Sequence, residues 1–330
     1  MAPAVPDGGI AVSPTTVPCM RRRLGSSGLS VTPLALGTML WGNAVDRHEA
    51  GDHLRAFAEA GGNLVDTAYG YGGGDAETIL GALIDTAVPR DDLVICTKAG
   101  ISRARGERHV DVSRRGLMSQ LETSLRRLGT DHVDLWLVHT WSDDVPLSET
   151  LSALEWAASS GRARYVGVSN YSGWQSARAF SLLESARIPL VANEIEYSLV
   201  CRTAEHEVSQ AATALGFGLL PWSPLGRGVL TGKYRNGIPS GSRAASVDFP
   251  GFAERFLGEQ SARVAEAVAM AARGLGAKPG EVALAWVRDR PGVAAPIVGA
   301  RTAAQLRSSL ASLELVLPDE IVEALDDVSA

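Results

Sequence analysis

The sequence predicts one α/β domain built as a parallel (β/α)8 barrel, with a β-hairpin before the barrel and an extra helix at the C-terminus. The chain has 330 residues and is 45% hydrophobic, which is enough to bury a large core. Short apolar runs alternate with segments of helical periodicity, and continuous apolar runs are typical of parallel strands buried on both faces. Eight such units in about 300 residues favour one barrel over two smaller domains.

Residues 1–20 are predicted to be a disordered tail, and residues 21–330 to form the barrel domain. The first nineteen residues contain four prolines and one charged residue, Asp7. They lack the basic start and the continuous apolar core of a signal peptide, so disorder is the simplest interpretation. Met20 is a candidate start, because the regular pattern begins right after it. Segment 21–31, RRRLGSSGLSV, then predicts a hairpin with a Gly-Ser turn that closes the bottom of the barrel.

The barrel itself is read from apolar runs of four to seven residues, each followed by a helix-like segment. Segments 46–61 and 113–129 show helical periodicity, and the second has a stripe of leucines on one face. The predicted N-caps are Ser113 and Ser148, and the predicted helix stops are Gly61, Gly129 and Gly161. The predicted strands are 34–37, 63–66, 93–97, 133–139, 164–169, 190–196, 217–223 and 293–299.

The composition argues against several classes of function. The net charge is −6, which suits a cytoplasmic enzyme and argues against broad nucleic-acid binding. The basic cluster at 20–25 is interpreted as solvated, and no apolar run is long enough to span a membrane. Cys19, Cys96 and Cys201 lie far apart without metal-ligand spacing, so we expect reduced thiols, no metal, and Cys96 in the core. No heptad pattern is visible, and a monomer is expected.

Polar residues stand at the predicted strand ends, where the chemistry of such barrels is placed. Asp66 ends the second strand and is followed by Tyr71. Lys98 ends the third strand, and His139 ends the fourth. The later strands end in or near Ser169, Asn170, Asn193, Glu194, Tyr197, Trp222, Ser223, Gly299 and Arg301.

These four residue types form a chemically meaningful set. A free tyrosine has a pKa near 10, and a nearby lysine cation lowers that pKa. An aspartate keeps the lysine charged, and a histidine can hydrogen-bond a substrate oxygen. Together they could protonate an alkoxide as it forms on a carbonyl. Singly, Lys98 could be a solvated lysine and His139 a core histidine, and either Tyr69 or Tyr71 could be the acid.

The sequence resembles the aldo-keto reductases over nearly its whole length, from about Arg22 to Ala330. The family is a (β/α)8 barrel that binds NADPH without a glycine-rich phosphate loop and reduces carbonyls to alcohols. The resemblance therefore implies an NADPH-dependent oxidoreductase acting on a small carbonyl compound. The matching stretches, in order, are 34–42, 63–84, 94–100, 133–154, 161–172, 194–199, 219–234 and 296–306.

The family's catalytic tetrad matches Asp66, Tyr71, Lys98 and His139. By this resemblance Tyr71 is the proton donor, Lys98 with Asp66 tunes it, and His139 orients the carbonyl. The register of the motif selects Tyr71 over Tyr69. The resemblance also places Trp222 on the nicotinamide, and Arg301 near the adenosine 2′-phosphate, which favours NADPH over NADH. The full set of expected cofactor contacts is Gly37, Thr38, Met39, Asp66, Ser169, Asn170, Glu194, Trp222, Ser223, Pro224, Leu225, Gly228, Lys233, Gly299, Arg301, Gln305 and Ser309.

Two positions depart from the family pattern. Glu194 stands where many relatives have a glutamine beside the nicotinamide. If this carboxylate is ionised, it is expected to favour the positively charged, oxidised cofactor. Ser309 stands where relatives often carry an asparagine, so one adenine contact is expected to be weaker.

The substrate is less defined by the sequence. Trp41, Tyr71, His139 and Trp141 are expected to line the pocket, together with loops around 99–112, 141–146 and 225–257. Arg103, Arg105 and Arg108 are interpreted as solvent-exposed, with an anionic substrate group as the alternative. General aldehyde or ketone reduction and reduction of a sugar-type keto group in secondary metabolism both fit. Two other classes stay open: a cofactor-binding module like potassium-channel β subunits, and a Schiff-base enzyme using Lys98.

Overall fold

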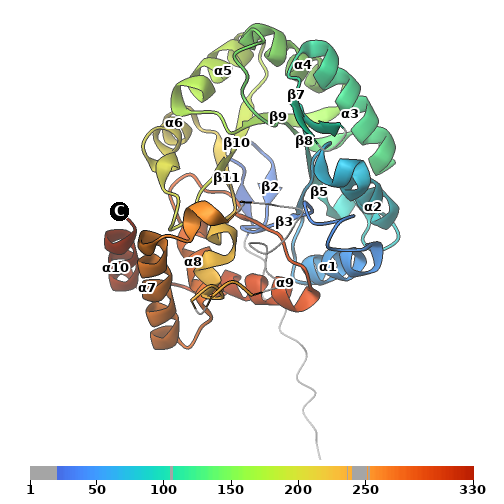
Figure 1. The fold of residues 1–330 in the computed structure, drawn as a ribbon. Coiled ribbons are helices and arrows are strands. Elements are labelled where there is room, and N and C mark those ends of the chain that lie inside the picture. Colours follow the sequence, from blue (N-terminus) through green and yellow to red (C-terminus); the bar gives the residue numbers. More distant parts are fainter. Residues whose placement is uncertain (1–20, 105–106, 236, 240–250, 252) are drawn as a thin grey trace, which may run out of the picture.

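The computed structural model describes residues 21–104, 107–235, 237–239, 251 and 253–330, and within them eight parallel strands form a nearly closed barrel surrounded by helices (Figure 1). The predicted (β/α)8 fold is confirmed. The predicted tail, residues 1–20, lies outside the described residues. The barrel strands are β3 (Ala35–Gly37), β4 (Leu64–Asp66), β5 (Val94–Ala99), β8 (Val133–Val138), β9 (Ala163–Ser169), β10 (Leu190–Glu196), β11 (Gly218–Trp222) and β12 (Ile297–Val298).

The strands pair in the sequence order that a barrel requires. The ladder runs from β11 through β10, β9, β8, β5, β4 and β3 to β12. The remaining gap is bridged by Leu219, whose N–H donates to Gly292 O (2.8 Å) and whose carbonyl accepts from Ala294 N (2.9 Å). Parallel neighbours bring all carboxyl ends of the strands to the same end of the barrel.

Helices cover the outside of the barrel, as Figure 1 shows. The last of them, α10, packs against α7, and the Asp326 side chain of α10 pairs with Arg290. This is the predicted extra C-terminal helix. The described helices are α1 (Arg47–Glu59), α2 (Asp75–Leu83), α3 (Arg114–Leu128), α4 (Leu147–Ser159), α5 (Gly173–Ser185), α6 (Val208–Leu215), α7 (Glu259–Leu275), α8 (Pro279–Arg288), α9 (Ala303–Leu310) and α10 (Asp319–Ser329). None of the helices in the described part of the chain combines the length and apolarity needed to cross a membrane.

The helix ends follow the predicted caps with one exception. Ser113 accepts a hydrogen bond from Gly116 N at the start of α3, and Gly129 adopts φ 67° at its end. Ser148 was predicted as an N-cap, and this is wrong. Pro146 caps α4, and its carbonyl accepts from Glu149 N (2.9 Å). Ser148 therefore lies inside the first turn, because the proline starts the helix two residues earlier.

A second hairpin lies where the sequence predicted only a loop. Strands β6 (Ile101–Ala104) and β7 (Glu107–Val110) pair antiparallel between β5 and α3. They follow the carboxyl end of β5, so the hairpin belongs to the end of the barrel that carries Lys98. The alternation of polar and apolar residues in this segment is too weak to distinguish a hairpin from a loop.

The N-terminal hairpin closes the opposite end of the barrel, as predicted. Its strands are β1 (Arg22–Arg23) and β2 (Ser30–Val31). Leu24 and Val31 are fully buried and belong to the same apolar cluster as barrel residues such as Leu64. The hairpin therefore acts as a hydrophobic plug, because it covers the amino ends of the strands.

We expect Gly25→Ala to lower the free energy of unfolding by about 1–3 kcal/mol. Gly25 has φ 58°, and a Cβ there would lie 2.4 Å from Gly216 O and 2.6 Å from Gly218 N. Gly28→Ala is the matched control, since its Cβ would meet only the Tyr165 hydroxyl at 3.8 Å. Urea unfolding of both variants measures the difference. Equal stability of the two variants would show that the hairpin is not tightly docked.

Alternate residues of each strand face the barrel interior, and this parity builds the site. One buried apolar cluster inside the barrel includes Leu64, Cys96, Leu137 and Ala192. Cys96 is thus a small core residue, as predicted. The residues two positions further along the same strands, or just past them, are Asp66, Lys98, His139 and Glu194. A polar layer therefore lies directly on the apolar core, at the carboxyl end of the barrel.

Candidate active site

Lys98 lies at the centre of the polar layer, between two carboxylates. Its Nζ is 2.5 Å from Asp66 Oδ1 and 3.2 Å from Glu194 Oε2, and it also donates to Thr67 O at 2.9 Å. The three side chains come from β4, β5 and β10 and have at most 4% exposure. Two carboxyl groups and one amine are thus buried together. The sequence predicted the pairing of Lys98 with Asp66 but not the contact with Glu194.

Burial and charge shift the pKa values in this cluster. Burial opposes the charge on Lys98, but the two carboxylates outweigh it and raise the pKa of Lys98 well above its ordinary value. Burial and then the neighbouring Asp66 raise the pKa of Glu194 to about 8. Burial also raises the pKa of Asp66, although Lys98 acts in the opposite direction. At neutral pH Lys98 therefore keeps its positive charge and Glu194 is mostly protonated. The expectation that an ionised Glu194 favours the oxidised cofactor then applies only at alkaline pH.

Three side chains in and beside this cluster have the ligand atoms of a metal site. Ligand atoms of Asp66, Cys96 and Glu194 lie within 4.8 Å of one another. The Lys98 ammonium, however, is within contact distance of both carboxylates. The positive charge that these groups require is therefore supplied by Lys98.

The two tyrosines of the loop after β4 face different surroundings. The Tyr71 ring centroid lies 5.2 Å from Lys98 Nζ and 5.8 Å from the His139 ring, in an edge-to-face arrangement. The Tyr69 ring instead lies 4.6 Å from the guanidinium of Arg127 on α3. Tyr71 therefore meets the polar layer, and Tyr69 packs toward the helices.

The pKa of Tyr71 is raised above its ordinary value, which corrects a simple expectation from the sequence. Burial is the largest cause, and the carboxylates of Asp66 and Glu194 add to it. Lys98 does lower the Tyr71 pKa, as expected, but less than burial raises it. The phenol is thus held in its protonated form, which is the form that can donate a proton.

An ion pair between Glu77 and Arg127 connects α2 and α3 to the loop that carries Tyr69 and Tyr71. Glu77, on α2, is fully buried and accepts from Thr97 Oγ1 at 2.7 Å and from Arg127 Nη1 at 3.0 Å. Arg127 also donates to Tyr69 O at 2.9 Å. Neither Glu77 nor Arg127 is among the site residues predicted from the sequence. Their signal was present, since an acid at a buried helix position needs a partner.

His139 follows β8 and completes the group. Its backbone N–H donates to Ala99 O at 2.8 Å, and its carbonyl accepts from Asn170 Nδ2 at 3.0 Å. Desolvation and the positive charges of Lys98 and Arg108 hold the pKa of His139 well below its usual range. The imidazole is therefore neutral, and its Nδ1 is buried without a hydrogen-bond partner in the structure.

Asn170 connects His139 to the predicted cofactor face. It adopts φ 61°, and its side chain donates to Ser169 Oγ (3.0 Å) and accepts from Trp222 Nε1 (3.0 Å). Ser169, Asn170 and Trp222 are thus joined in one hydrogen-bonded row across β9–β11. The structure brings together three of the residues expected around the nicotinamide.

The loop after β11 has several residues in the left-handed region of backbone conformation. Ser223, Gly226, Arg227 and Gly228 all have positive φ, between 53° and 97°. A Cβ on Gly228 would lie 2.5 Å from Lys233 Nζ, so this backbone and the lysine lie in close approach. Pro224 and Leu225 lie in the same segment. Part of the predicted loop 225–257 lies outside the described residues.

The remaining predicted cofactor residues lie on two other strand ends. At the end of β3, Thr38 N donates to Asp66 O at 2.9 Å, and Thr38 Oγ1 is buried without a partner. Gly37 and Met39 flank it. After β12, Gly299 is exposed, and the Arg301 N–H donates to the Gln305 side chain at 2.9 Å in the first turn of α9. Ser309 Oγ donates to Gln305 O at 3.2 Å.

The two tryptophans expected in the substrate pocket lie in different environments. Trp41 is 1% exposed and belongs to the main core cluster. Trp141 is partly exposed and packs edge-to-face on Tyr171 and Trp174, at 5.2 and 5.4 Å. Trp174 is 60% exposed. Trp141 is therefore the better placed of the two to meet a ligand.

A charged cluster that the sequence analysis missed follows Glu194 along β10. Glu196 is buried and accepts from Arg227 Nη2 at 3.0 Å, and it also pairs with Arg255. The Arg227 guanidinium lies 5.8 Å from the Trp222 ring and 5.4 Å from the Phe256 ring. This cluster could have been predicted from strand alternation, because Glu196 lies two residues after Glu194 and therefore faces the same side of the strand.

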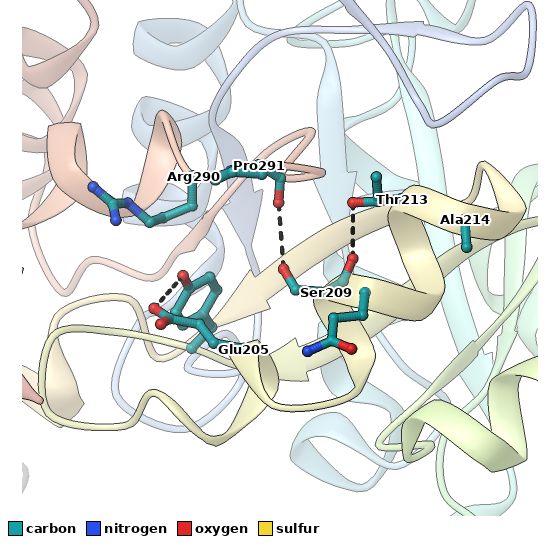
Figure 2. Close-up of a pocket in the computed structure, with 8 residues that line it drawn as sticks. Glu205, Ser209, Thr213, Ala214, Arg290 and Pro291 are labelled. Carbon is teal, nitrogen blue, oxygen red and sulfur yellow. Dashed lines mark hydrogen bonds between the residues drawn. The ribbon is translucent and has the colours of Figure 1, made fainter.

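A surface pocket of about 550 Å³ lies elsewhere, beside α6 and the turn after α8 (Figure 2). There Tyr197 donates to Glu205 at 2.7 Å, and Ser209 donates to Pro291 O at 3.4 Å. Tyr197, which follows the sixth barrel strand, lines this pocket, whereas the residues expected to bind cofactor or to act in catalysis do not. The candidate active site is therefore the polar layer at the barrel end and not this pocket.

Comparisons with known proteins identify the family of this chain. The aldo/keto reductase family model matches residues 33–330. The chain is 34% identical over 315 residues to a "Probable voltage-gated potassium channel subunit beta" from Oryza sativa subsp. japonica (93% of this chain, 95% of the relative). It is 35% identical over 320 residues to the "Uncharacterized oxidoreductase YrpG" of Bacillus subtilis (92% and 94%). It is 34% identical over 304 residues to the "L-glyceraldehyde 3-phosphate reductase" of Escherichia coli K12 (88% and 87%). With this match and a barrel of the predicted topology, the chain belongs to the aldo/keto reductase family of oxidoreductases.

Proposed function

We propose that this oxidoreductase uses NADPH to reduce an aldehyde or ketone to the alcohol, with Tyr71 as the proton donor. The observation that carries the proposal is the meeting of Tyr71, Lys98 and His139 at the carboxyl end of the barrel. The Tyr71 ring centroid lies 5.2 Å from the Lys98 ammonium and 5.8 Å from the His139 ring. A phenol, a retained ammonium and a neutral imidazole around one point suit the protonation of a developing alkoxide.

The residues at the barrel mouth fit a nicotinamide dinucleotide phosphate. Ser169, Asn170 and Trp222 offer polar groups and an aromatic face, and Thr38 Oγ1 is a buried hydroxyl without a protein partner. Lys233 and Arg301 supply the cationic groups that bind phosphates in proteins. When bound, the cofactor supplies the hydride that reduces the carbonyl carbon.

The chain's own residues divide the remaining work. Tyr71 O–H gives its proton to the carbonyl oxygen, and the Lys98 ammonium stabilises the phenolate that is left. Asp66 holds Lys98 in place through the 2.5 Å contact. His139, being neutral, orients the carbonyl by a hydrogen bond without adding charge. In the reverse direction the Tyr71 phenolate acts as the base.

The substrate class proposed is a small carbonyl compound, with a sugar-type keto group as the second candidate. Arg108 is exposed on β7, and its charge reaches His139. One relative is named as a reductase of L-glyceraldehyde 3-phosphate, an anionic aldehyde. Phosphorylated aldehydes therefore belong in any substrate panel beside neutral aldehydes, ketones and keto sugars.

We expect NADPH to be oxidised in the presence of one or more of these carbonyls, and NADH to serve less well. Arg301→Leu is expected to reduce the preference for NADPH over NADH about tenfold or more, because a charge-assisted contact to the 2′-phosphate is lost. Arg273→Leu is the control, since this side chain is 62% exposed on α7. Absorbance at the nicotinamide band follows each reaction. No oxidation with any carbonyl would contradict the proposed function.

The NADPH assay and borohydride trapping together test the two alternative classes. A cofactor-binding module of the kind named for the potassium-channel relatives would bind NADPH without steady turnover. A Schiff-base enzyme would give a borohydride-trapped adduct on Lys98 and would need no nicotinamide. The buried ammonium of Lys98, held by Asp66, favours neither an imine nor an amine nucleophile.

A further inference from the structure

Glu194 contacts Lys98 in addition to Asp66, the carboxylate that the family motif pairs with this lysine. Its carboxylate is 2% exposed and comes within 3.2 Å of Lys98 Nζ, while Asp66 contacts the same nitrogen at 2.5 Å. Two buried carboxylates therefore share a single cation. If both were ionised, the buried cluster would carry a net negative charge, which is costly in a low-dielectric interior.

The two carboxylates compete for a limited number of N–H donors on Lys98. An ammonium group has three N–H donors. Two are committed, to Asp66 Oδ1 at 2.5 Å and to Thr67 O at 2.9 Å. Glu194 Oε2 is close, yet it is buried and makes no hydrogen bond in the structure. The third N–H has two neighbouring groups, Glu194 Oε2 at 3.2 Å from Nζ and Tyr71, whose ring centroid lies 5.2 Å from Nζ.

We propose that Glu194 is a positioning residue for carbonyl reduction: in its neutral form it leaves the third N–H of Lys98 to Tyr71, and in its ionised form it takes that N–H away. This inference rests on the proposed function for its effect on turnover. Ionised Glu194 also adds a negative charge near Tyr71, which makes the phenol a weaker acid. The alkaline limit of reduction is therefore set by Glu194 and not by Tyr71 itself.

The groups that face Glu194 agree with this assignment. They are Asp66 from β4, Lys98 and Cys96 from β5, and Tyr71 from the loop after β4. The residues paired with Glu194 on the adjacent strands, Ser169 on β9 and Leu220 on β11, are uncharged. Lys98 is the nearest cation, and the tighter Asp66 contact makes Asp66 the ionised partner. The extra proton then resides on Glu194, whose pKa is raised to about 8.

The first test needs no cofactor and no turnover. Carboxyl-labelled glutamate in the full chain is followed by carbon NMR from pH 6 to pH 10, in the wild type and in Glu194→Gln. We expect one wild-type carboxyl signal to titrate with a pKa within about one unit of 8. This titration should be absent in Glu194→Gln. Glu205→Gln is the control, because Glu205 is a paired carboxylate outside the site with a lowered pKa. If every wild-type glutamate titrates in the acid range, the inference is overturned, whether or not the variant folds.

The second test links the titration to catalysis. We expect wild-type kcat for reduction to fall about tenfold per pH unit above the Glu194 pKa, and Glu194→Gln to keep its rate to higher pH. Glu205→Gln should retain the wild-type profile. An unchanged alkaline limb in Glu194→Gln contradicts the positioning role. A chain with the titration but no reductase activity would instead refute the proposed function, so the two failures are distinguishable.

Discussion

Replacing Tyr71 by Phe is expected to lower kcat/KM for carbonyl reduction about 100- to 10,000-fold, the range typical of a lost general acid. The ring stays in place against Lys98 and His139, so only the hydroxyl is removed. Steady-state rates of NADPH oxidation measure the loss. Cofactor affinity, measured by fluorescence quenching, should change little, because the defect lies in proton donation.

Tyr69→Phe is the matched control for this result. Its ring lies 4.6 Å from the guanidinium of Arg127 on α3, whereas the Tyr71 ring lies beside Lys98. We expect its turnover to stay within a few-fold of the wild type. A large loss in Tyr69→Phe together with an active Tyr71→Phe would show that Tyr69, and not Tyr71, is the proton donor. The structure supports Tyr71 through packing, where the residues alone allowed both.

Replacing Lys98 by Met is expected to have the largest effect on stability. The change removes the positive charge between Asp66 and Glu194, and breaking a buried pair by removing one partner costs about 3–5 kcal/mol. Reduction should also be lost, because Tyr71 loses its cation. Urea unfolding measures the first effect, and the NADPH assay measures the second.

The stability loss in Lys98→Met should depend on pH in a defined direction. Without the cation, both folded-state carboxyl pKa values lie further above their unfolded values, so the folded variant binds more protons than the unfolded chain. Its stability therefore falls as pH rises from about 4 toward 8. The difference from the wild type should be smaller at pH 5 than at pH 8. Lys278→Met is the control, since that lysine is 69% exposed; a pH-independent loss in Lys98→Met would contradict the buried pair.

Much of the fold was predictable because it depends on local patterns. Apolar runs separated by helical periodicity identify buried strands and covering helices, and eight of them in order leave few topologies. Caps such as Ser113 and Gly129 were also readable. Ser148 is the exception, because α4 begins directly after Pro146 and Ser148 falls within its first turn.

The site was predictable to the extent that strand parity and motif register identify it. Both place Asp66, Lys98 and His139 at one end of the barrel. Neither reports distances, so the contact of Glu194 with Lys98 was missed, although Glu194 itself was named. The Glu77–Arg127 pair was missed for the same reason, since its partners are 50 residues apart in the chain.

The sequence by itself determined the barrel, the plug hairpin and the residue types at the strand ends, because these follow from hydrophobic period and short-range turn chemistry. Only the tertiary structure decided the electrostatics. Burial outweighs the Lys98 charge at Tyr71, and the second carboxylate shares the ammonium with Asp66. Desolvation and pairing depend on which side chains meet across strands, and that information exists only once the barrel is closed.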